Sequence, residues 1–459
     1  MTRQRPAREA GMPWPRYWDE AMETIAPGAL RELEDRLVRD AASYVWDRSP
    51  FYHAKFREAG VTPQQITGAR DLPRLPFTSK AELRSSQEAH PPFGAHTAVP
   101  VQEVVRVHRT SGSTGRPLYI AMTRRDAHIT NECGARAFWA AGLRPDHAVV
   151  HCLNYCLWLG GYTDHSTLEH TGAAVVPFGV GHSDLLVRTI RDLGVTAISC
   201  TPSYMAVLAR VVRDELRIEP RELGLRLGLF GGEPGMAIPG VRHALQETWG
   251  MAAKDANYGM SDALSNFAAE CDARPELHFL GQGAILCQLI DPERERDKEI
   301  AAGESGEFVF TTLGREGQPL LRYRSGDVVT VVGTDACECG RTGFRFRVLG
   351  RSDDMLIVKG INVFPSAVET ILADLRPELT GAFRILLPKP NPLDVLSILA
   401  EHGEAVAPDH LPGLRAKVEG RLREFLSARA EVELVAPNSL PGFESKAKRL
   451  VKLYAGETR

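Results

Sequence analysis

The sequence predicts an α/β protein with a large N-terminal lobe built on mainly parallel sheets and a small α+β domain at its C-terminal end. From about residue 100, short apolar segments of strand length alternate with amphipathic segments of helix length. This alternation is typical of parallel sheets covered by helices on both faces. A new polar stretch near residue 350 opens a second series of strands and helices, so we divide the chain into residues 1–352 and 353–459.

The elements of the large lobe follow from hydrophobic periodicity. Residues 17–60 carry apolar side chains at helical spacing. The predicted strands and helices that follow are, in order, 148–153, 172–178, 183–194 (helix), 195–202, 203–216 (helix) and 225–234. Three loops, 109–117, 231–235 and 257–262, are expected at the carboxyl ends of strands, where parallel sheets bind their ligands.

The small domain shows a turn at Gly360 and a predicted helix that begins near Pro365. A strand at 381–388, a helix at 411–428 and a strand at 431–435 complete its pattern, before a basic tail. Alternating strand and helix segments of this length suffice for an α+β domain.

The composition excludes several classes of protein. With 459 residues, 43% apolar and 25% charged, the chain is ordinary for a globular protein of two or three folding units. A net charge of −3 favours neither a nucleic acid nor a membrane surface as partner. We see no apolar run of the ~18 residues that span a bilayer and no secretion signal, so we expect a cytoplasmic protein whose eight cysteines are mostly reduced.

The segment His108–Pro117 (HRTSGSTGRP) combines two glycines with four hydroxyl side chains. Such a loop can direct backbone N–H groups and hydroxyls at one point and bind a phosphate. A plain flexible loop is the alternative on this segment alone. The Gly-Lys-Ser/Thr ending of a P-loop NTPase is missing, which disfavours that class.

Taken together, eight segments resemble the adenylate-forming superfamily and, within it, the phenylacetate–coenzyme A ligase-like family. In chain order they are SPFYHAKFREAGV, TSGSTGRP, CTPSY, FGGEPG, NYGMSD, LLRYRSGD, GRSDDMLIVKGINVFPSAVE and ESKAKR. The resemblance implies a mobile C-terminal lid and a two-step reaction that uses ATP, Mg²⁺ and coenzyme A. A carboxylate first attacks the α-phosphate of ATP to give an acyl-adenylate and pyrophosphate. A thiol then displaces AMP and forms a thioester.

The resemblance also assigns nucleotide contacts. The phosphates of ATP would lie in a cradle made by Thr110, Ser111, Ser113, Thr114 and Gly115. Many superfamily relatives carry a lysine just after the proline of this loop, where this chain has Leu118. The turn against the adenine comprises Gly231, Gly232, Glu233 and Pro234; a simple turn after a strand is the alternative. The segment that stacks on the adenine comprises Asn257, Tyr258, Gly259, Met260 and Ser261.

Five charged residues complete the implied machinery. Asp262 would be the magnesium ligand, where the family usually has glutamate; a helix N-cap is the alternative for this residue. Asp327 would accept hydrogen bonds from the ribose hydroxyls, and Arg351 would contact the ribose or a phosphate. Asp353 matches the hinge, and Lys446 matches the lysine that reaches back for adenylation. Ser445 stands where the motif has glycine, and Lys448 competes with Lys446 for the role.

A possible structural Zn²⁺ site draws on separated parts of the chain. Its three thiols and one imidazole belong to Cys271, His278, Cys337 and Cys339. This donor set fits a closed tetrahedral site. Four ordinary reduced side chains are the alternative.

The acyl pocket is expected within residues 151–165, which resemble the segment that lines the acid pocket in the family. Its members would be Phe138, Tyr155, Trp158, Gly160 and Gly161. Aromatic side chains suit an aryl or arylacetyl group, although core packing is the alternative for Phe138. Leu153, Cys156 and Leu159 add bulk, so a benzoate-like acid is as plausible as phenylacetate.

Two other functions compete with an aryl-acid–coenzyme A ligase. In the first, the acyl group passes to a carrier-protein thiol or to an amine. In the second, the chain is a zinc-stabilised nucleotide-binding module without catalysis, a reading that Asp327 and Lys446 disfavour.

Overall fold

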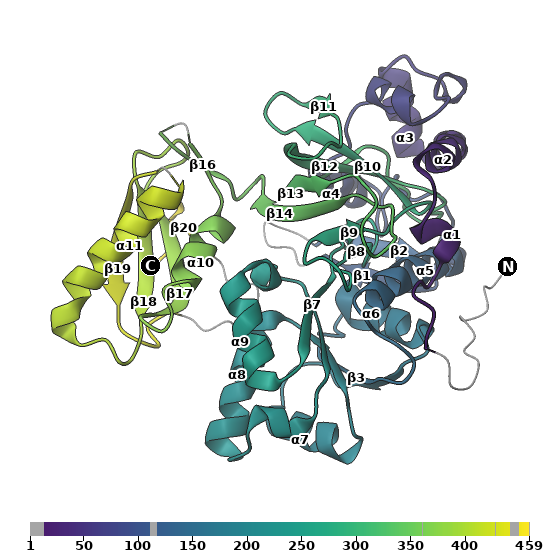
Figure 1. Cartoon of the computed structure of the whole chain (residues 1–459). Coiled ribbons are helices and arrows are strands. Elements are labelled where there is room, and N and C mark those ends of the chain that lie inside the picture. Colours follow the sequence, from purple (N-terminus) through teal and green to yellow (C-terminus); the bar gives the residue numbers. More distant parts are fainter. Residues whose placement is uncertain (1–12, 111–116, 360, 427, 441–448, 459) are drawn as a thin grey trace.

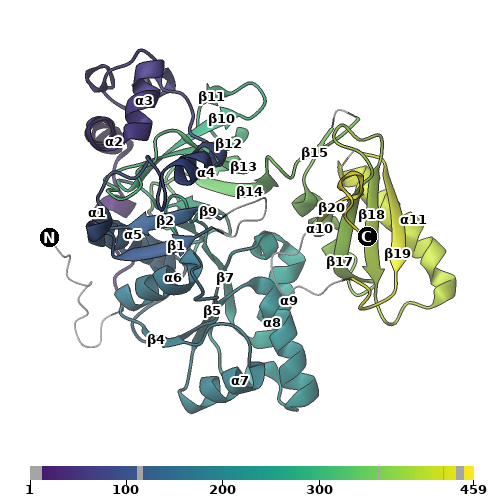
Figure 2. The same ribbon diagram turned by 180° about the vertical axis from the view of Figure 1, so that it is seen from behind.

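A computed structural model describes residues 13–110, 117–359, 361–426, 428–440 and 449–458 (Figure 1). A large lobe extends to strand β14 (Arg345–Arg351), and a smaller domain follows it. Both views place this smaller domain beside helices α8 (Pro202–Arg210) and α9 (Pro239–Trp249) of the large lobe (Figures 1 and 2). The predicted α/β class is confirmed.

The N-terminal segment is helical, as its periodicity predicts. Its helices are α1 (Glu20–Glu23), α2 (Pro27–Arg48), α3 (Pro50–Glu58) and α4 (Lys80–Ala89). Ser49 follows the end of α2 and caps the start of α3, because its side chain accepts a hydrogen bond from the Tyr52 N–H. Pro50, the first residue of α3, has a backbone angle that suits the first helical turn. α4 begins with a capping box in which Ser79 and Glu82 bind each other's backbone N–H groups.

A five-stranded parallel sheet forms the centre of the large lobe, in the order β4-β3-β5-β6-β7. Its strands are β3 (Ala148–His151), β4 (Ala174–Pro177), β5 (Ala197–Cys200), β6 (Leu227–Gly231) and β7 (Ala252–Asn257). The four predicted strands are present with shorter bounds. The predicted second helix is split, because α8 continues as a π-helical turn over Val211–Glu215.

Helices cover both faces of this sheet, since successive strand side chains point to opposite sides. Val150, Ile198 and Phe230 share a buried cluster with side chains of α7 (Ser183–Asp192), α8 and α9. Their neighbours Val149, Ala197 and Leu229 belong to a different cluster, with side chains of α5 (Arg124–Ala140) and α6 (Leu159–His170).

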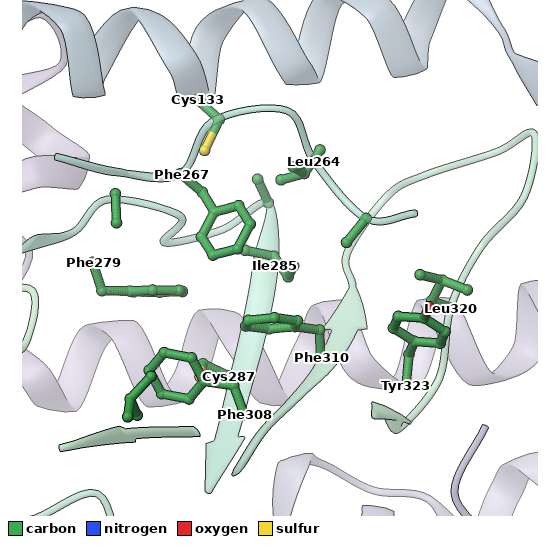
Figure 3. Close-up of a cluster of buried hydrophobic side chains, with 14 of the residues drawn as sticks. Cys133, Leu264, Phe267, Phe279, Ile285, Cys287, Phe308, Phe310, Leu320 and Tyr323 are labelled. Atoms are coloured by element: carbon green, nitrogen blue, oxygen red, sulfur yellow. The ribbon is translucent and has the colours of Figure 1, made fainter. Parts of the chain in front are cut away.

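The large lobe also contains a seven-stranded antiparallel sheet that the sequence analysis did not identify. Its strands are β8 (Ala268–Ala269), β9 (Leu277–Phe279), β10 (Ile285–Asp291), β11 (Arg296–Lys298), β12 (Ser305–Thr312), β13 (Tyr323–Gly333) and β14. Figure 3 shows the aromatic core against it, where the rings of Phe267, Phe279, Phe308 and Phe310 gather. The T-shaped pair Phe267–Phe310 has its ring centroids 5.1 Å apart.

The phosphate-loop prediction needs a correction of position. The strands on either side of it, β1 (Arg106–Arg109) and β2 (Tyr119–Met122), pair only with each other, as an antiparallel hairpin. The loop therefore joins the strands of a hairpin and does not follow a strand of the parallel sheet. Its local sequence predicted a turn, but not which strands it connects.

The small domain has a mixed four-stranded sheet in the order β19-β18-β17-β20. Its elements are β15 (Leu356–Val358), β16 (Ile361–Val363), α10 (Pro365–Ala373), β17 (Leu379–Leu387), β18 (Leu396–His402), α11 (Leu411–Leu426), β19 (Ala430–Val435) and β20 (Leu450–Lys452). β18 and β20 were not predicted from the sequence. A separate buried cluster unites residues between Leu356 and Leu450. Within the described residues, no helix of either part combines the length and apolarity needed to cross a bilayer.

Candidate active site

The carboxyl edge of the parallel sheet brings two of the predicted nucleotide segments together. β6 ends at Gly231 and β7 at Asn257, and these residues are paired in the parallel register. A Cβ on Gly231 would lie 2.6 Å from the backbone oxygen of Asn257, so only glycine allows this approach. Glu233 and Pro234, which begins the 3₁₀ turn Pro234–Ala237, therefore leave the sheet beside Tyr258.

Tyr258, Asp327 and Arg351 form one hydrogen-bonded group, although they come from two sheets. The Tyr258 hydroxyl donates to Asp327 Oδ2 over 2.9 Å. Arg351 Nη1 lies 3.1 Å from Asp327 Oδ1, and its Nε donates to Asp353 Oδ1 over 2.9 Å. Burial and the Asp327 carboxylate hold the pKa of Tyr258 well above its ordinary value, so the phenol stays a donor. The predicted ribose, adenine and hinge residues thus adjoin one another.

The rest of the predicted adenine segment forms a tight turn. A Cβ on Gly259 would lie 2.0 Å from the Ser265 backbone oxygen, which explains glycine there. Met260 closes the turn, since its N–H donates to the Leu264 carbonyl over 2.8 Å. Ser261 is half-buried on it.

Asp262 occupies the buried end of this turn, with its side chain 5% exposed. No helix starts here among the described residues, so the N-cap alternative is wrong. Lys80 Nζ lies 3.1 Å from Asp262 Oδ2. Asp262 Oδ1 is buried and has no hydrogen-bond partner within the described part of the chain. A buried carboxylate oxygen with spare acceptor capacity fits a hard cation such as Mg²⁺.

The phosphate loop is described only at its ends. Thr110 and Leu118 close it through two hydrogen bonds, from Thr110 N to Leu118 O (2.9 Å) and from Leu118 N to Thr110 Oγ1 (3.2 Å). The Thr110 hydroxyl therefore already has a backbone partner. Ser111, Ser113, Thr114 and Gly115 lie outside the described residues, as does Lys446.

The predicted acyl segment lies against the predicted adenine turn. A Cβ on Gly232 would lie 3.7 Å from the Trp158 ring, and one on Gly160 would lie at the same distance from that indole. A Cβ on Gly161 would lie 2.2 Å from the Asn154 backbone oxygen, which requires glycine at the start of α6. The Tyr155 hydroxyl contacts His165 Nδ1 at 2.9 Å.

Phe138 does not join this group. Its side chain is fully buried in the cluster between α5, α6 and the sheet, with Val149 and Leu168. The structure thus favours core packing for this residue, because its helix covers the sheet instead of ending at the sheet's carboxyl edge.

Two buried polar residues that sequence reasoning missed hold the acyl segment in place. His151 Nε2 lies 3.0 Å from the carbonyl oxygens of Gly160 and Gly161, and its Nδ1 lies 3.1 Å from Ser199 Oγ. Two carbonyl acceptors require the proton on Nε2, and burial lowers the pKa of His151 to about 4, so the ring is neutral. The position of His151 at the end of a strand was the available signal.

Asp164 is the second missed residue, and it connects the acyl segment to the nucleotide segment. It accepts hydrogen bonds from Asn257 Nδ2 (2.6 Å) and from the Ser265 hydroxyl. Burial raises the pKa of Asp164 to about 7, although both hydrogen bonds act in the opposite direction. An acidic residue inside an α-helix with glycine-rich flanks gave no sequence signal for this position.

The predicted metal ligands converge. Ligand atoms of Cys271, His278, Cys337 and Cys339 lie within 4.8 Å of one another, and all four residues are buried. The Cys271 and Cys337 sulfurs are 4.0 Å apart, and Cys339 Sγ is 3.9 Å from His278 Nε2. Bonds of about 2.3 Å to a tetrahedral Zn²⁺ give edges near ~3.8 Å. The hydrogen bonds from Cys271 and His278 lower the pKa of Cys339, which favours a thiolate ligand.

The small domain meets the large lobe close to the adenine turn. Burial raises the pKa of Glu233, Glu369 of α10 adds to this rise, and Arg449 opposes it. Arg449 also pairs with Glu369 over 2.5 Å. The Ser366 hydroxyl donates to the Leu349 carbonyl of β14. Arg449, directly before β20, therefore lies near the predicted adenine turn.

Comparison with known proteins finds two family matches and several similar enzymes. The AMP-binding enzyme family matches residues 37–313, and the AMP-binding enzyme C-terminal domain matches residues 360–453. A phenylacetate-coenzyme A ligase from Thermus thermophilus is 35% identical, with 90% of this chain and 94% of that protein covered. One from Pseudomonas putida is 34% identical, over 83% and 84%.

Solved structures add a comparison of domain orientation. A 2-hydroxyisobutyryl-CoA ligase in its postadenylation state, with 2-HIB-AMP, is 32% identical, with a TM-score of 0.88 and coverage of 97% of this chain and 94% of that chain. The same ligase in its thioesterification state gives a TM-score of 0.71. The two domains of this chain are thus oriented more nearly as in the first of these states.

Proposed function

Because this chain belongs to the AMP-binding enzyme family, in its phenylacetate–coenzyme A ligase branch, it is an acid–thiol ligase, and we propose that its acid substrate is aromatic. The coarse reaction follows from the family. An acid is adenylated at the expense of ATP, and coenzyme A then takes the acyl group as a thioester. The observation that carries the aromatic proposal is the position of the Trp158 ring, which would lie 3.7 Å from a Cβ placed on Gly232 and so adjoins the nucleotide turn.

The nucleotide would lie over the carboxyl edge of the parallel sheet. Asp327 has the acceptor capacity for ribose hydroxyls, since a carboxylate oxygen accepts more than one hydrogen bond. Tyr258 binds one oxygen of that carboxylate and Arg351 binds the other, so the two residues fix its orientation. The glycine backbone at 231–232 allows a planar base to approach closely. This arrangement supports ATP binding with the α-phosphate near Trp158, where an acid carboxylate could attack in line.

Asp262 would hold Mg²⁺ through the oxygen that otherwise has no partner. When bound, Mg²⁺ neutralises charge on the phosphate oxygens. Thr110, Ser111, Ser113, Thr114 and Gly115 would donate to the outer phosphates from the other side.

The acid would enter between Trp158 and Tyr155. The glycines at 160 and 161 and the neutral His151 below them fix the backbone of this segment. The Tyr155 hydroxyl lies 2.9 Å from His165 Nδ1, and His165 Nε2 lies 3.2 Å from Glu169 Oε1. These groups suit an aryl acid with a polar ring substituent, such as an amino- or hydroxybenzoate, at least as well as phenylacetate.

The small domain would act as the lid, with the boundary at residues 352 and 353 and Asp353 as the hinge. Lys446 would reach the carboxylate and α-phosphate during adenylation and stabilise the charge there. The higher TM-score against a postadenylation state supports a lid oriented for the first half-reaction. Rotation about the hinge would then open the site to the thiol of coenzyme A.

We further propose that Cys271, His278, Cys337 and Cys339 hold a structural Zn²⁺. Backbone N–H groups of Ala273 and Arg274 each lie 3.3 Å from Cys271 Sγ, as donors to a ligand thiolate do. The N-terminal segment closes over the site, since the Tyr17 hydroxyl donates to the Cys339 carbonyl over 2.9 Å. Four protein ligands leave no open position, so this metal would stabilise the fold and take no part in the reaction.

A substrate screen tests the proposed function. Purified protein is incubated with ATP, Mg²⁺ and single acids, with and without coenzyme A, and pyrophosphate release is measured. We expect benzoates and arylacetates to give the highest kcat/KM and turnover to depend on coenzyme A. A preference for short aliphatic acids would reject the aromatic proposal. Sustained turnover with a carrier protein or an amine in place of coenzyme A would support the alternative acceptor.

A further inference from the structure

The position just after Pro117, where many superfamily relatives carry a lysine, offers no cation in this chain. The residue after Pro117 is Leu118, whose side chain is 1% exposed. It belongs to the same buried cluster as Leu83 of α4 and Ala263, which follows Asp262. Leu118, α4 and the turn that carries Asp262 therefore pack against one shared core. A neighbouring element can therefore supply the positive charge that Leu118 does not.

α4 supplies such a charge. Lys80 is its first residue, and its side chain is 34% exposed, whereas the Asp262 side chain that it pairs with is 5% exposed. The ammonium group thus stands at the solvent side of a buried carboxylate. Arg84 follows one helical turn later, so both cations project from one face of α4. The charge of Arg84 acts on Tyr323, which the charge of Asp262 also affects.

Lys80 is not needed merely to neutralise the charge of Asp262. Arg315 is 6% exposed and donates through Nη1 to the backbone carbonyls of Asp262 and Ala263, at 2.5 and 2.6 Å. Its guanidinium already places a positive charge behind the carboxylate. Arg315 is shared with the carboxylate of Asp126, and Lys80 is the more exposed of the two cations near Asp262. A second, accessible cation beside a carboxylate oxygen without a partner indicates a site prepared for an anion together with a metal ion.

We propose that Lys80 binds the β- and γ-phosphates of ATP and stabilises the pyrophosphate leaving group. This inference rests on the proposed function of the site. In the ATP complex Asp262 would hold Mg²⁺ through Oδ1, and Lys80 would turn from Oδ2 to the phosphate oxygens. During adenylation the acid carboxylate forms a bond to the α-phosphorus, and the bond from that phosphorus to the bridging oxygen breaks. The electron pair leaves with pyrophosphate, where the Lys80 charge lies; Lys80 itself forms no covalent bond.

The two half-reactions separate this role from a structural one, because pyrophosphate takes part only in the first. The variants are Lys80→Ala and Lys80→Arg, with Lys298→Ala as the matched control. Lys298 is 32% exposed and also pairs with a carboxylate, Glu304, at 2.6 Å, but on β11. The assays are ATP–pyrophosphate exchange with an accepted acid, and thioester formation from synthetic acyl-adenylate and coenzyme A.

We expect Lys80→Ala to lower kcat/KM for adenylation by roughly 10²–10³-fold, as removal of one transition-state charge contact does. Its KM for pyrophosphate should rise, thioester formation should stay within about threefold of the wild type, and Lys80→Arg should recover most of the loss. Lys298→Ala should change neither assay. Equal losses in both half-reactions, or an unchanged KM for pyrophosphate, would overturn the proposal.

A binding measurement keeps the test independent of the acid. The rise in Tm caused by magnesium pyrophosphate is compared between the wild type and Lys80→Ala. A rise in the wild type that is lost in the variant supports the inference even if no acid in the screen is accepted. An equal rise in both proteins contradicts the inference while leaving the proposed function intact.

Discussion

The Tyr258 hydroxyl donates to Asp327 Oδ2 over 2.9 Å, and this bond joins the loop after the parallel sheet to a strand of the antiparallel sheet. The ring of Tyr258 is held at T-shaped angles by Phe267 and Phe346, with centroids 5.4 and 5.2 Å away. A flexible carboxylate is thereby fixed in orientation before any nucleotide binds. Such preorganisation reduces the entropy lost on binding.

Removal of this hydroxyl should weaken ATP binding more than it weakens the fold. Tyr258→Phe keeps the aromatic contacts but loses a hydrogen bond to a charged acceptor, worth about 1.5–3 kcal/mol. We expect KM for ATP to rise about tenfold and the free energy of unfolding to fall by about 1 kcal/mol. Steady-state kinetics and urea unfolding measure the two effects. An unchanged KM for ATP would contradict the role given to Asp327.

Two glycine-to-alanine substitutions, one at the contact between β6 and β7 and one at an exposed position of a helix, should change stability in opposite directions. Gly231→Ala would place its Cβ 2.6 Å from the Asn257 backbone oxygen, so the strands must separate. Gly420→Ala, in α11, meets nothing within 4 Å. We expect the first to lower Tm by several degrees and to impair adenylation. The second should raise stability by about 0.5–1 kcal/mol, because alanine is the better helix former. Thermal unfolding of both variants provides the comparison.

Asp164 should make stability depend on pH. Its pKa is about 7 in the folded chain, against about 3.9 when unfolded. Between these values the folded state retains a proton that the unfolded state has lost, so stability falls as pH rises, with a slope approaching ~1.4 kcal/mol per pH unit. Asp164→Asn removes this contribution. The difference in unfolding free energy between variant and wild type should shift in favour of the variant from pH 5 to pH 7 and then level off. A difference that does not change with pH would rule out a raised pKa.

The cysteine and histidine cluster should contain about one zinc ion per chain when the purified protein is analysed for metals. Cys339→Ser should lose the metal and lower Tm by several degrees, since a structural zinc site contributes folding free energy directly. Cys156→Ser is the control, because that thiol is exposed and lies outside the cluster. A wild-type protein with far less than one zinc, or a Cys339→Ser variant of unchanged Tm, would remove the assignment.

Lys446→Ala should reduce adenylation by orders of magnitude but keep much of the thioester formation from preformed acyl-adenylate. The reason is that a cation near the α-phosphate is needed only while the carboxylate attacks. Lys448→Ala should behave nearly as the wild type if Lys446 is the residue in this role. Rapid-quench measurement of each half-reaction distinguishes the two lysines, and a loss of equal size in both half-reactions would reject Lys446.

The parts that could be predicted from the sequence are those with a local signal. Apolar runs such as the one at 195–202 revealed the parallel strands, and glycine-rich motifs marked the turns at 231–235 and 257–262. Alternation between buried and exposed positions is weaker in the antiparallel sheet, where β12 is buried over nearly its whole length, so this sheet was missed. A short buried strand also resembles a helix segment when taken without its partners.

The roles of His151 and Asp164 could not be predicted, although both lie within the predicted acyl segment. Each depends on a hydrogen bond to a residue elsewhere in the chain, Ser199 for His151 and Asn257 for Asp164. Lys80 and Asp262 are far apart in sequence, so their pairing depends on tertiary structure. Phe138 shows the opposite case, in which an aromatic residue next to a plausible pocket segment belongs to the core.

Arg351 has one guanidinium but two carboxylate neighbours, Asp327 on the nucleotide side and Asp353 on the lid side. If the backbone rotates at residue 353, Arg351 must either lose its ion pair with one of these carboxylates or move the other one with it. Binding of the ribose at Asp327 and rotation of the lid would then be energetically coupled through Arg351 alone, so that each changes the equilibrium of the other.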